Sequence, residues 1–285
     1  MTEVLKKKIM DYREKTFRFL PNDRVQTQKE AVAFINQRGF LLFHPAKDVD
    51  FPSLWVAGAG DRPVPNEHDD PGHKTWQWKD KLLGLRKCYY GRLLGQKMSF
   101  VSLEMLPSFL CLSNNLEYEN DYLLVYQKGE MSHEAKRIYE SLLDEGPMDT
   151  LALKKKAGLG GKENNYRYSK ALGWLQTELM ILPIGIAEAG HWNYAFIFDI
   201  VPRYYPEIVE ESTGIKRSHA RMRIMKRLFI SLGATDERNI RRILRWKPVD
   251  LKTTLQQLEA LEFLTSNIEI KDITRPQLVL RELLI

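Results

Sequence analysis

Three polar side chains near the start of the chain have types that could take part in a reaction. His44 ends an apolar run that begins at Gly39, and Asp48 and Asp50 follow it closely. A neutral imidazole or an ionised carboxylate can polarise water or stabilise a developing positive charge. The same residue types also form ordinary turns, and His44 precedes Pro45. We therefore treat His44, Asp48 and Asp50 as catalytic candidates beside this plainer interpretation.

A second group of polar and aromatic side chains follows in the same segment. Two imidazoles and two carboxylates lie between residues 68 and 73, but metal sites usually draw their ligands from separated elements. No Cys pair or His-Glu-x-x-His helix supports such a site, so we predict no metal. The chain has no P-loop, no dinucleotide fingerprint and no G-x-S-x-G nucleophile, so we predict no cofactor. The candidates for lining a pocket are Trp55, His68, Asp69, Asp70 and His73.

Basic side chains gather in two later stretches and indicate an anionic partner. Between Arg203 and Lys247, 12 Lys and Arg stand against 5 Asp and Glu, whereas the whole chain carries a formal charge of +6. Such clustering is typical of a surface that neutralises phosphates, although a solvated charged helix face is the plainer alternative. We predict contacts to double-stranded DNA from Lys154, Lys155, Lys156, Lys162, Tyr166, Arg167, Lys170, Arg221, Arg241 and Arg242.

The segment from Ser132 to Ile200 predicts the elements that position the first basic stretch. Ser132 is a helix N-cap type, and apolar residues follow it at helical spacing. A second short helix runs into a glycine-rich turn, a third helix follows, and two β-like segments close the series. Helix, helix, turn, helix and hairpin is the order of a winged helix-turn-helix, whose third helix enters the major groove.

A similar order of three helices followed by an extended segment recurs after residue 212.

The first part of the chain contains a long polar loop by prediction. Residues 44–78 hold five of the 13 prolines of the chain, and residues 79–96 then return to helical spacing. The predicted fold is mainly α, with tandem winged helix-turn-helix units and small β-hairpin wings. The predicted domains are an N-terminal winged-helix-like domain with this loop (1–120), a central winged helix (121–210) and a C-terminal winged helix (211–285), with the first boundary in the polar stretch 114–121.

Length and composition bound the class of protein. The 285 residues are 44% hydrophobic, which is enough for packed cores in two or three small domains. The two cysteines, Cys88 and Cys111, do not support a disulfide framework, so a reduced setting is expected. The N-terminus lacks the apolar run of a signal peptide, and no stretch approaches about 18 uninterrupted apolar residues. We therefore predict a cytoplasmic, nucleoid-associated protein without a membrane span.

Three stretches taken together resemble the AlkZ/YcaQ-type DNA glycosylases, a family of tandem winged helices. They are similar to that family's leucine-rich helix, to its recognition helix with the wing, and to its third winged helix. The stretches are GRLLGQKMSFVSLEMLPSFLCL (91–112), YSKALGWLQTELMILPIG (168–185) with YAFIFDIVPRYYP (194–206), and ARMRIMKRLFISLGATDERNIRRIL (220–244). The resemblance extends from about residue 26 to residue 272.

The resemblance implies excision of alkylated purines and unhooking of interstrand crosslinks, without a metal. The family's reactive Gln-x-Asp or Gln-x-Gln follows a motif beginning with Gly, which corresponds to residues 39–44 here. Leu42 stands in place of the first Gln, and His44 stands at the second polar position. One hypothesis is therefore a monofunctional DNA glycosylase that relies on His44 and nearby carboxylates. The other is a winged-helix transcriptional regulator without catalysis, which has no need for the polar, Trp-rich segment from 44 to 73.

Overall fold

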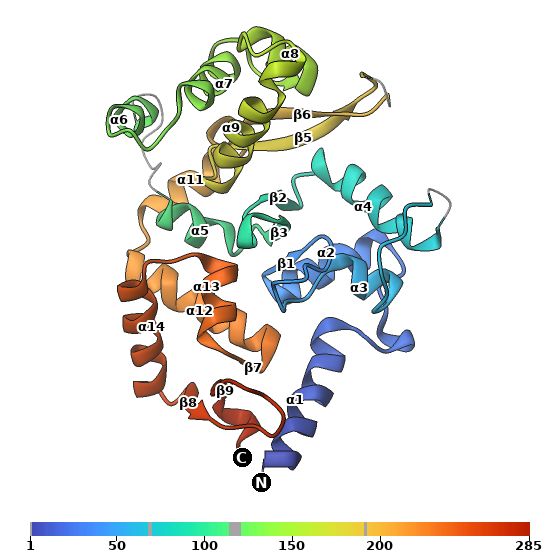
Figure 1. Ribbon diagram of the computed structural model, residues 1–285, viewed down its shortest axis with the longest axis vertical. Coiled ribbons are helices and arrows are strands. Elements are labelled where there is room, and N and C mark those ends of the chain that lie inside the picture. The colour runs from blue at the N-terminus through green and yellow to red at the C-terminus, as the bar shows by residue number, and fades with distance from the viewer. Residues whose placement is uncertain (1, 68–69, 114–120, 191–192) are drawn as a thin grey trace.

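The computed structural model describes residues 2–67, 70–113, 121–190 and 193–285. Within these residues the chain is mainly helical, and its strands form three antiparallel three-stranded sheets. Each sheet belongs to one stretch of the chain, and the order helix, strand, helix, helix, hairpin occurs three times (Figure 1). The fold class predicted from the sequence, tandem winged helix-turn-helix units, is confirmed.

The first unit carries the catalytic candidates. Its two-stranded wing pairs over five residues, with Tyr90 opposite Phe100. Its elements are α2 (Gln28–Arg38), β1 (Phe40–Leu42), α3 (Leu54–Ala59), η2 (Pro71–His73), α4 (Lys74–Leu83), β2 (Cys88–Arg92), η3 (Leu94–Gln96) and β3 (Met98–Ser102), followed by α5 (Leu106–Leu112).

The long polar loop predicted from residue 44 to residue 78 is wrong in part, because the segment contains α3 and the start of α4. Ser53 caps α3 by accepting a hydrogen bond from the Val56 N–H at 3.2 Å. The six residues of α3 are too few to show a helical period in the sequence. Trp76 and Trp78 lie inside α4, not in a loop before it.

The helix predicted over residues 79–96 is also wrong beyond Leu83, where α4 ends. Cys88 to Arg92 form a strand whose two faces are both covered. Tyr89 packs into the core shared with the third unit, whereas Tyr90 packs into the core of the first unit. A strand buried on both faces reads as a continuous apolar run, without the alternation that identifies a half-exposed strand.

The central unit lies at the top of Figure 1, and its hairpin projects over α4. Ser132 and Asp149 cap its first two winged-helix helices through their side chains, as their positions predict. The elements are α6 (Asp121–Gln127), α7 (His133–Glu145), β4 (Met148–Asp149), α8 (Thr150–Lys156), α9 (Asn165–Thr177), β5 (Ile181–Ala187) and β6 (Ala195–Ile200).

The third unit is the last along the chain, and the N-terminal helix α1 (Thr2–Phe17) packs against it. From α1, the Tyr12 hydroxyl donates to the carbonyl of Ile230 at 2.7 Å, and Arg13 donates to that of Leu232 at 3.0 Å. The elements are α10 (Val201–Tyr204), α11 (Pro206–Thr213), α12 (Arg217–Leu232), β7 (Ala234–Thr235), α13 (Glu237–Leu244), α14 (Pro248–Ala260), β8 (Leu264–Ile268) and β9 (Gln277–Leu280).

The sheet topology is the same in all three units. The last strand of each unit lies between the other two, in the orders β1-β3-β2, β4-β6-β5 and β7-β9-β8. Helices α4, α9 and α14 are therefore the third helices of their units, which occupy the position of a recognition helix. No helix in the described part of the chain combines the length and apolar character needed to cross a membrane.

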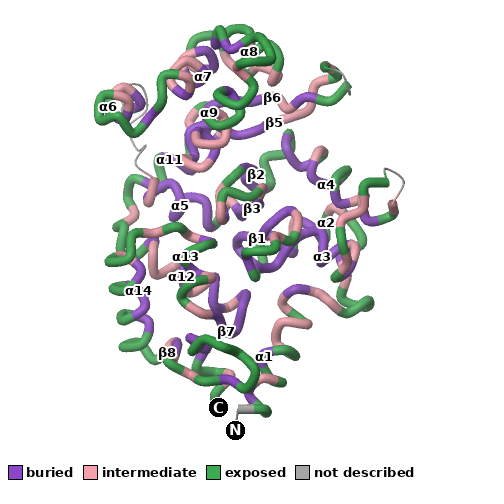
Figure 2. The backbone as a smooth tube through the Cα atoms, in the orientation of Figure 1, coloured by how far each residue is buried: buried purple, intermediate pink, exposed green. Residues whose placement is uncertain are grey.

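One apolar core joins the first and third units. Phe40 and Met105 from the first unit and Ile224 and Leu228 from the third are fully buried in the same cluster. Figure 2 shows this buried backbone running between the two units. The core fixes the placement of α13 relative to the first unit. The polar stretch 114–121, which predicts the first domain boundary, lies outside the described residues except for Asp121, so the boundaries at 120 and 210 stay predictions.

Gly39 offers a test of the turn that leads into β1. Its φ is +78°, and a Cβ there would lie 2.7 Å from Cγ of Arg227, so Gly39→Ala should lower the free energy of unfolding by about 1–2 kcal/mol. Gly173→Ala in α9 is the matched control, because its Cβ would meet Arg92 Cδ at an ordinary 3.7 Å and alanine favours the helix. Urea unfolding of both variants tests this. Equal stabilities would contradict the account of Gly39.

Candidate functional site

An aromatic pocket lies where the first unit meets the wing of the central unit. Its volume is about 580 Å³, within the range of small-molecule sites. Rings come from the end of β1, from α4, from β2 and from β6, so two units build the walls. The rings are Phe43, His44, Trp76, Tyr90 and Phe196, and the charged lining residues are Lys47, Asp48, Arg92 and Lys97.

His44 is a neutral wall of this aromatic pocket. Its ring stacks on Phe43 with centroids 4.1 Å apart, and the edge of Trp55 lies behind it. Burial, with smaller effects from His73 and Lys79, lowers the pKa of His44 to about 4. Its Nε2 atom is buried and has no hydrogen-bond partner among the described residues. The imidazole is therefore uncharged at neutral pH, and its Nε2 atom is enclosed by the surrounding side chains.

The two aspartate candidates are separated by the structure. Asp48 lines the aromatic pocket together with His44. Asp50 does not line it, because its carboxylate binds the Arg13 guanidinium at 2.8 Å and its backbone bonds to Asn239. Asp50 thus ties the segment after β1 to α1 and α13, and the structure brings only His44 and Asp48 together.

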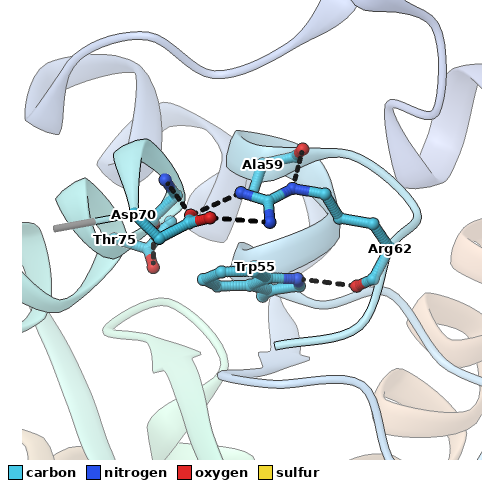
Figure 3. Close-up of polar contacts among 6 residues, drawn as sticks. Trp55, Ala59, Arg62, Asp70 and Thr75 are labelled. Atoms are coloured by element: carbon cyan, nitrogen blue, oxygen red, sulfur yellow. Dashed lines mark hydrogen bonds and ion pairs between the residues drawn. The ribbon is translucent and has the colours of Figure 1, made fainter. Parts of the chain in front are cut away.

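The predicted pocket residues Trp55, Asp70 and His73 form a packed support behind His44, outside the pocket lining. The buried Trp55 donates its indole N–H to the carbonyl of Arg62 at 3.0 Å, and the Arg62 guanidinium lies over the ring and binds Asp70 (Figure 3). The hydrogen bond from Arg62 holds the pKa of Asp70 below its ordinary value. His73 contacts the Trp55 ring at 5.8 Å.

His68 and Asp69 lie outside the described residues. Among the residues that the structure does describe, no group of three or more His, Cys, Asp or Glu side chains could hold a metal ion.

Lys79, which is not among the predicted site residues, places its ammonium behind the aromatic pocket. Its side chain is 0% exposed, and Nζ lies 4.7 Å from the Trp76 ring centroid and 4.8 Å from that of Phe196. Nζ donates to the Tyr194 hydroxyl at 2.5 Å and pairs with Asp80 at 2.5 Å, and Tyr194 in turn donates to Asp80. Burial lowers the pKa of Lys79, opposed by Asp80.

No local signal could have identified this lysine. In the sequence it stands between Trp78 and Asp80, in a run typical of an amphipathic helix surface. Its burial depends on Tyr194 and Phe196, which arrive from the central wing more than 100 positions later in the chain.

A basic strip continues from the aromatic pocket onto α13. We define it as Lys47, Arg92, Lys97, Arg238 and Arg245, none of which has an ion-pair partner among the described residues. A shallow depression lined by Lys97, Arg238 and Arg245 shares Lys97 and Asp48 with the aromatic pocket.

Gly95 in η3 makes the close approach of α13 possible. A Cβ at Gly95 would lie 2.9 Å from the carbonyl oxygen of Arg242, so a larger residue would push α13 away. Two predicted DNA contacts lie on the same helix but have partners. Arg241 pairs with Glu237 at 2.6 Å, and Arg242 donates to the backbone carbonyl of Asp48 at 3.1 Å.

The remaining predicted DNA contacts divide into free and engaged side chains. Lys155, Lys162 and Lys170 are exposed and have no ion-pair partner in the part of the chain described, and Tyr166 is 76% exposed. Arg221 is the least available, since it pairs with Asp250 at 2.9 Å and its side chain is 19% exposed. Three others are engaged within the central unit: Lys154 with Asn165, Lys156 with Glu145 and Arg167 with Glu134.

The fold and the site together define a tandem winged-helix protein with an aromatic pocket beside a basic surface. Residues 25–245 match the family model described as AlkZ related, so the chain belongs to the AlkZ-related family. This confirms the family-level resemblance found in the sequence. No curated protein matches the chain.

A solved structure supports the same architecture. The chain is similar to the Streptomyces sahachiroi DNA glycosylase AlkZ with a TM-score of 0.59 and 12% sequence identity. The match covers 97% of this chain and 70% of that chain. At this identity the likeness establishes the fold alone.

The low pKa of His44 has a consequence for stability. An unfolded histidine binds a proton near pH 6.5, whereas the folded His44 does so near pH 4. The unfolded state therefore gains protons first as the pH falls, and the contribution of His44 to stability, complete above pH 6.5, should be lost between pH 6.5 and 4. Urea unfolding across this range should show a smaller loss for His44→Phe than for the wild type. Parallel curves, or an imidazole that titrates near 6.5 by NMR, would contradict the burial argument.

Proposed function

We propose that this protein binds duplex DNA along the basic strip, receives an extruded base in the aromatic pocket, and excises damaged bases from alkylated DNA. The observation that carries the proposal is the continuity of the two features, which share Asp48 and Lys97 in their linings. An enzyme that acts on the glycosidic bond must take the base out of the stack, and aromatic walls replace the lost stacking. Unpaired arginines beside the pocket suit the flanking phosphates.

The lining residues support hydrolysis of the N-glycosidic bond. We place Leu42 and His44 at the positions of the reactive Gln residues of AlkZ/YcaQ-type glycosylases. Leu42 is fully buried in the core, so it cannot contact a substrate. In the proposed reaction the bond from C1′ to the base nitrogen breaks, the base leaves with the electron pair, and water adds to C1′. Asp48 accepts the proton of that water, and Nδ1 of the neutral His44 accepts a hydrogen bond that orients it, since Nε2 is enclosed.

A non-catalytic winged-helix regulator is the second candidate, and the first half of α9 favours it. Tyr166 is exposed at the position where a recognition helix begins, and Lys155, Lys162 and Lys170 are exposed on α8, before α9 and on α9. The second half of α9 packs against β2, where Arg92 Cδ would lie 3.7 Å from a Cβ at Gly173. Such a regulator would bind through α9 and leave the aromatic pocket empty.

Charge reversal separates the two surfaces. Lys97→Glu with Arg245→Glu should weaken duplex binding by about tenfold or more and reduce the slope of log affinity against log salt by about two, since two phosphate contacts are lost. Lys7→Glu with Lys8→Glu on the exposed face of α1 is the matched control. Fluorescence anisotropy over a salt series measures both. A larger loss from Lys155→Glu with Lys170→Glu would favour the regulator.

Excision itself is tested with duplexes bearing alkylated purines, followed by detection of abasic sites. Asp48→Asn should lower the excision rate by about a hundredfold or more while leaving duplex affinity nearly unchanged, because a general base is lost. His44→Ala should lower the rate in the same way. Asp50→Asn is the control, since Asp50 lies outside the pocket lining. Absence of abasic sites with the wild type on both cationic and neutral alkylated purines, or full activity of Asp48→Asn, would refute the glycosylase proposal.

A further inference from the structure

The buried ammonium of Lys79 sits against the rings that form the aromatic pocket. Nζ lies within 6.0 Å of the ring centroids of Phe43, Trp76, Tyr90, Tyr194 and Phe196. Four of these rings also line the pocket. Aromatic rings attract a cation through the negative charge of their faces. Because the ammonium of Lys79 already interacts with these rings, they attract a second cation in the pocket more weakly.

The counter-ion of Lys79 does not cancel this charge inside the pocket. Asp80 lies 2.5 Å from Nζ, but its side chain is 30% exposed, whereas that of Lys79 is 0% exposed. Water screens the field of the exposed carboxylate more strongly than that of the enclosed ammonium. The field that reaches the pocket walls therefore stays positive.

The charged side chains that line the pocket also disfavour a cationic ligand. Lys47, Arg92 and Lys97 line the pocket, against Asp48 as the one carboxylate among the described lining residues. His44 is neutral because its pKa is lowered to about 4. A site for a cationic ligand combines carboxylates with aromatic faces that no other cation engages. Here Lys79 engages four of the rings, and Asp48 is the one carboxylate among the described lining residues.

We propose that Lys79 makes the aromatic pocket selective for a neutral planar base over a cationic one. The inference rests on the proposed function, and it narrows the substrate class to DNA lesions that leave the base uncharged. Hydrolysis of such a nucleoside leaves the bonding electron pair, and thus a negative charge, on the departing base. A fixed positive field stabilises that charge, whereas a cationic purine departs as a neutral base and gains nothing from it.

Two duplexes of equal shape test the selectivity. One carries a single 7-methylguanine, which is cationic, and the other carries 7-deaza-7-methylguanine, its neutral isostere. Both lesions pair with cytosine and carry a 2′-fluoro sugar that resists hydrolysis, so the cost of extrusion and the readout are matched. The wild type should bind the neutral duplex about five- to tenfold more tightly, the size expected for one partly screened like-charge contact. Lys79→Met should bring the ratio of the two dissociation constants close to one, while Lys79→Arg should keep it.

Two results of this binding experiment distinguish a failure of the selectivity from a failure of the proposed function. Equal affinity of the wild type for both duplexes, or tighter binding of the cationic one, overturns the selectivity while leaving the base pocket standing. Affinity for both that is no higher than for an unmodified duplex overturns the base pocket and the selectivity together. A wild-type preference for the neutral duplex that persists unchanged in Lys79→Met would overturn the assignment of the selectivity to Lys79.

Discussion

The burial of one positive charge is the constraint on which this structure depends. Lys79 has no exposed surface, and its ammonium is satisfied by Asp80 from its own helix and by Tyr194 from the central wing. A hydrogen bond to a charged group contributes about 1.5–3 kcal/mol, and the one between Lys79 and Tyr194 joins α4 to the wing. The wing and α4 are therefore held together, and the contact brings Phe196 to the pocket wall. The pocket exists because two winged-helix units meet at this lysine.

A second constraint sets what lies beside the pocket. The first and third units share an apolar core that includes Phe40 and Ile224, so they cannot turn relative to each other without exposing it. The core places α13 against η3, where Gly95 admits the backbone of Arg242. Arginines of the third unit thus continue the lining of a pocket built by the other two. A repeated fold with a conventional recognition helix in each unit would not by itself create this arrangement.

Local signals in the sequence predicted the elements that depend on local physics. Ser132 begins a helix as its type indicates, because capping is decided within a few residues. The prediction of a long loop from residue 44 to residue 78 was wrong in part, because α3 is too short to show a helical period in the sequence.

The site was harder to predict than the fold. The structure brings His44 and Asp48 into the lining of one pocket, whereas Asp50 and Asp70 bind arginines. Whether a basic side chain is free also depends on partners distant in sequence, as Arg221 with Asp250 shows. No feature of the sequence around Lys79 indicates its burial, since the side chains that enclose it come from the wing of the central unit.

The proposed function requires that a base leaves the duplex and enters the aromatic pocket. Photo-crosslinking tests it most directly, with a duplex that carries one 5-iodouracil at a mismatch and with mass spectrometry to locate the adduct. The account predicts adducts on Trp76 or Phe196, whose rings would stack on an extruded base. Adducts confined to Tyr166, the exposed aromatic side chain near the start of α9, would contradict it and assign DNA recognition to the central winged helix alone.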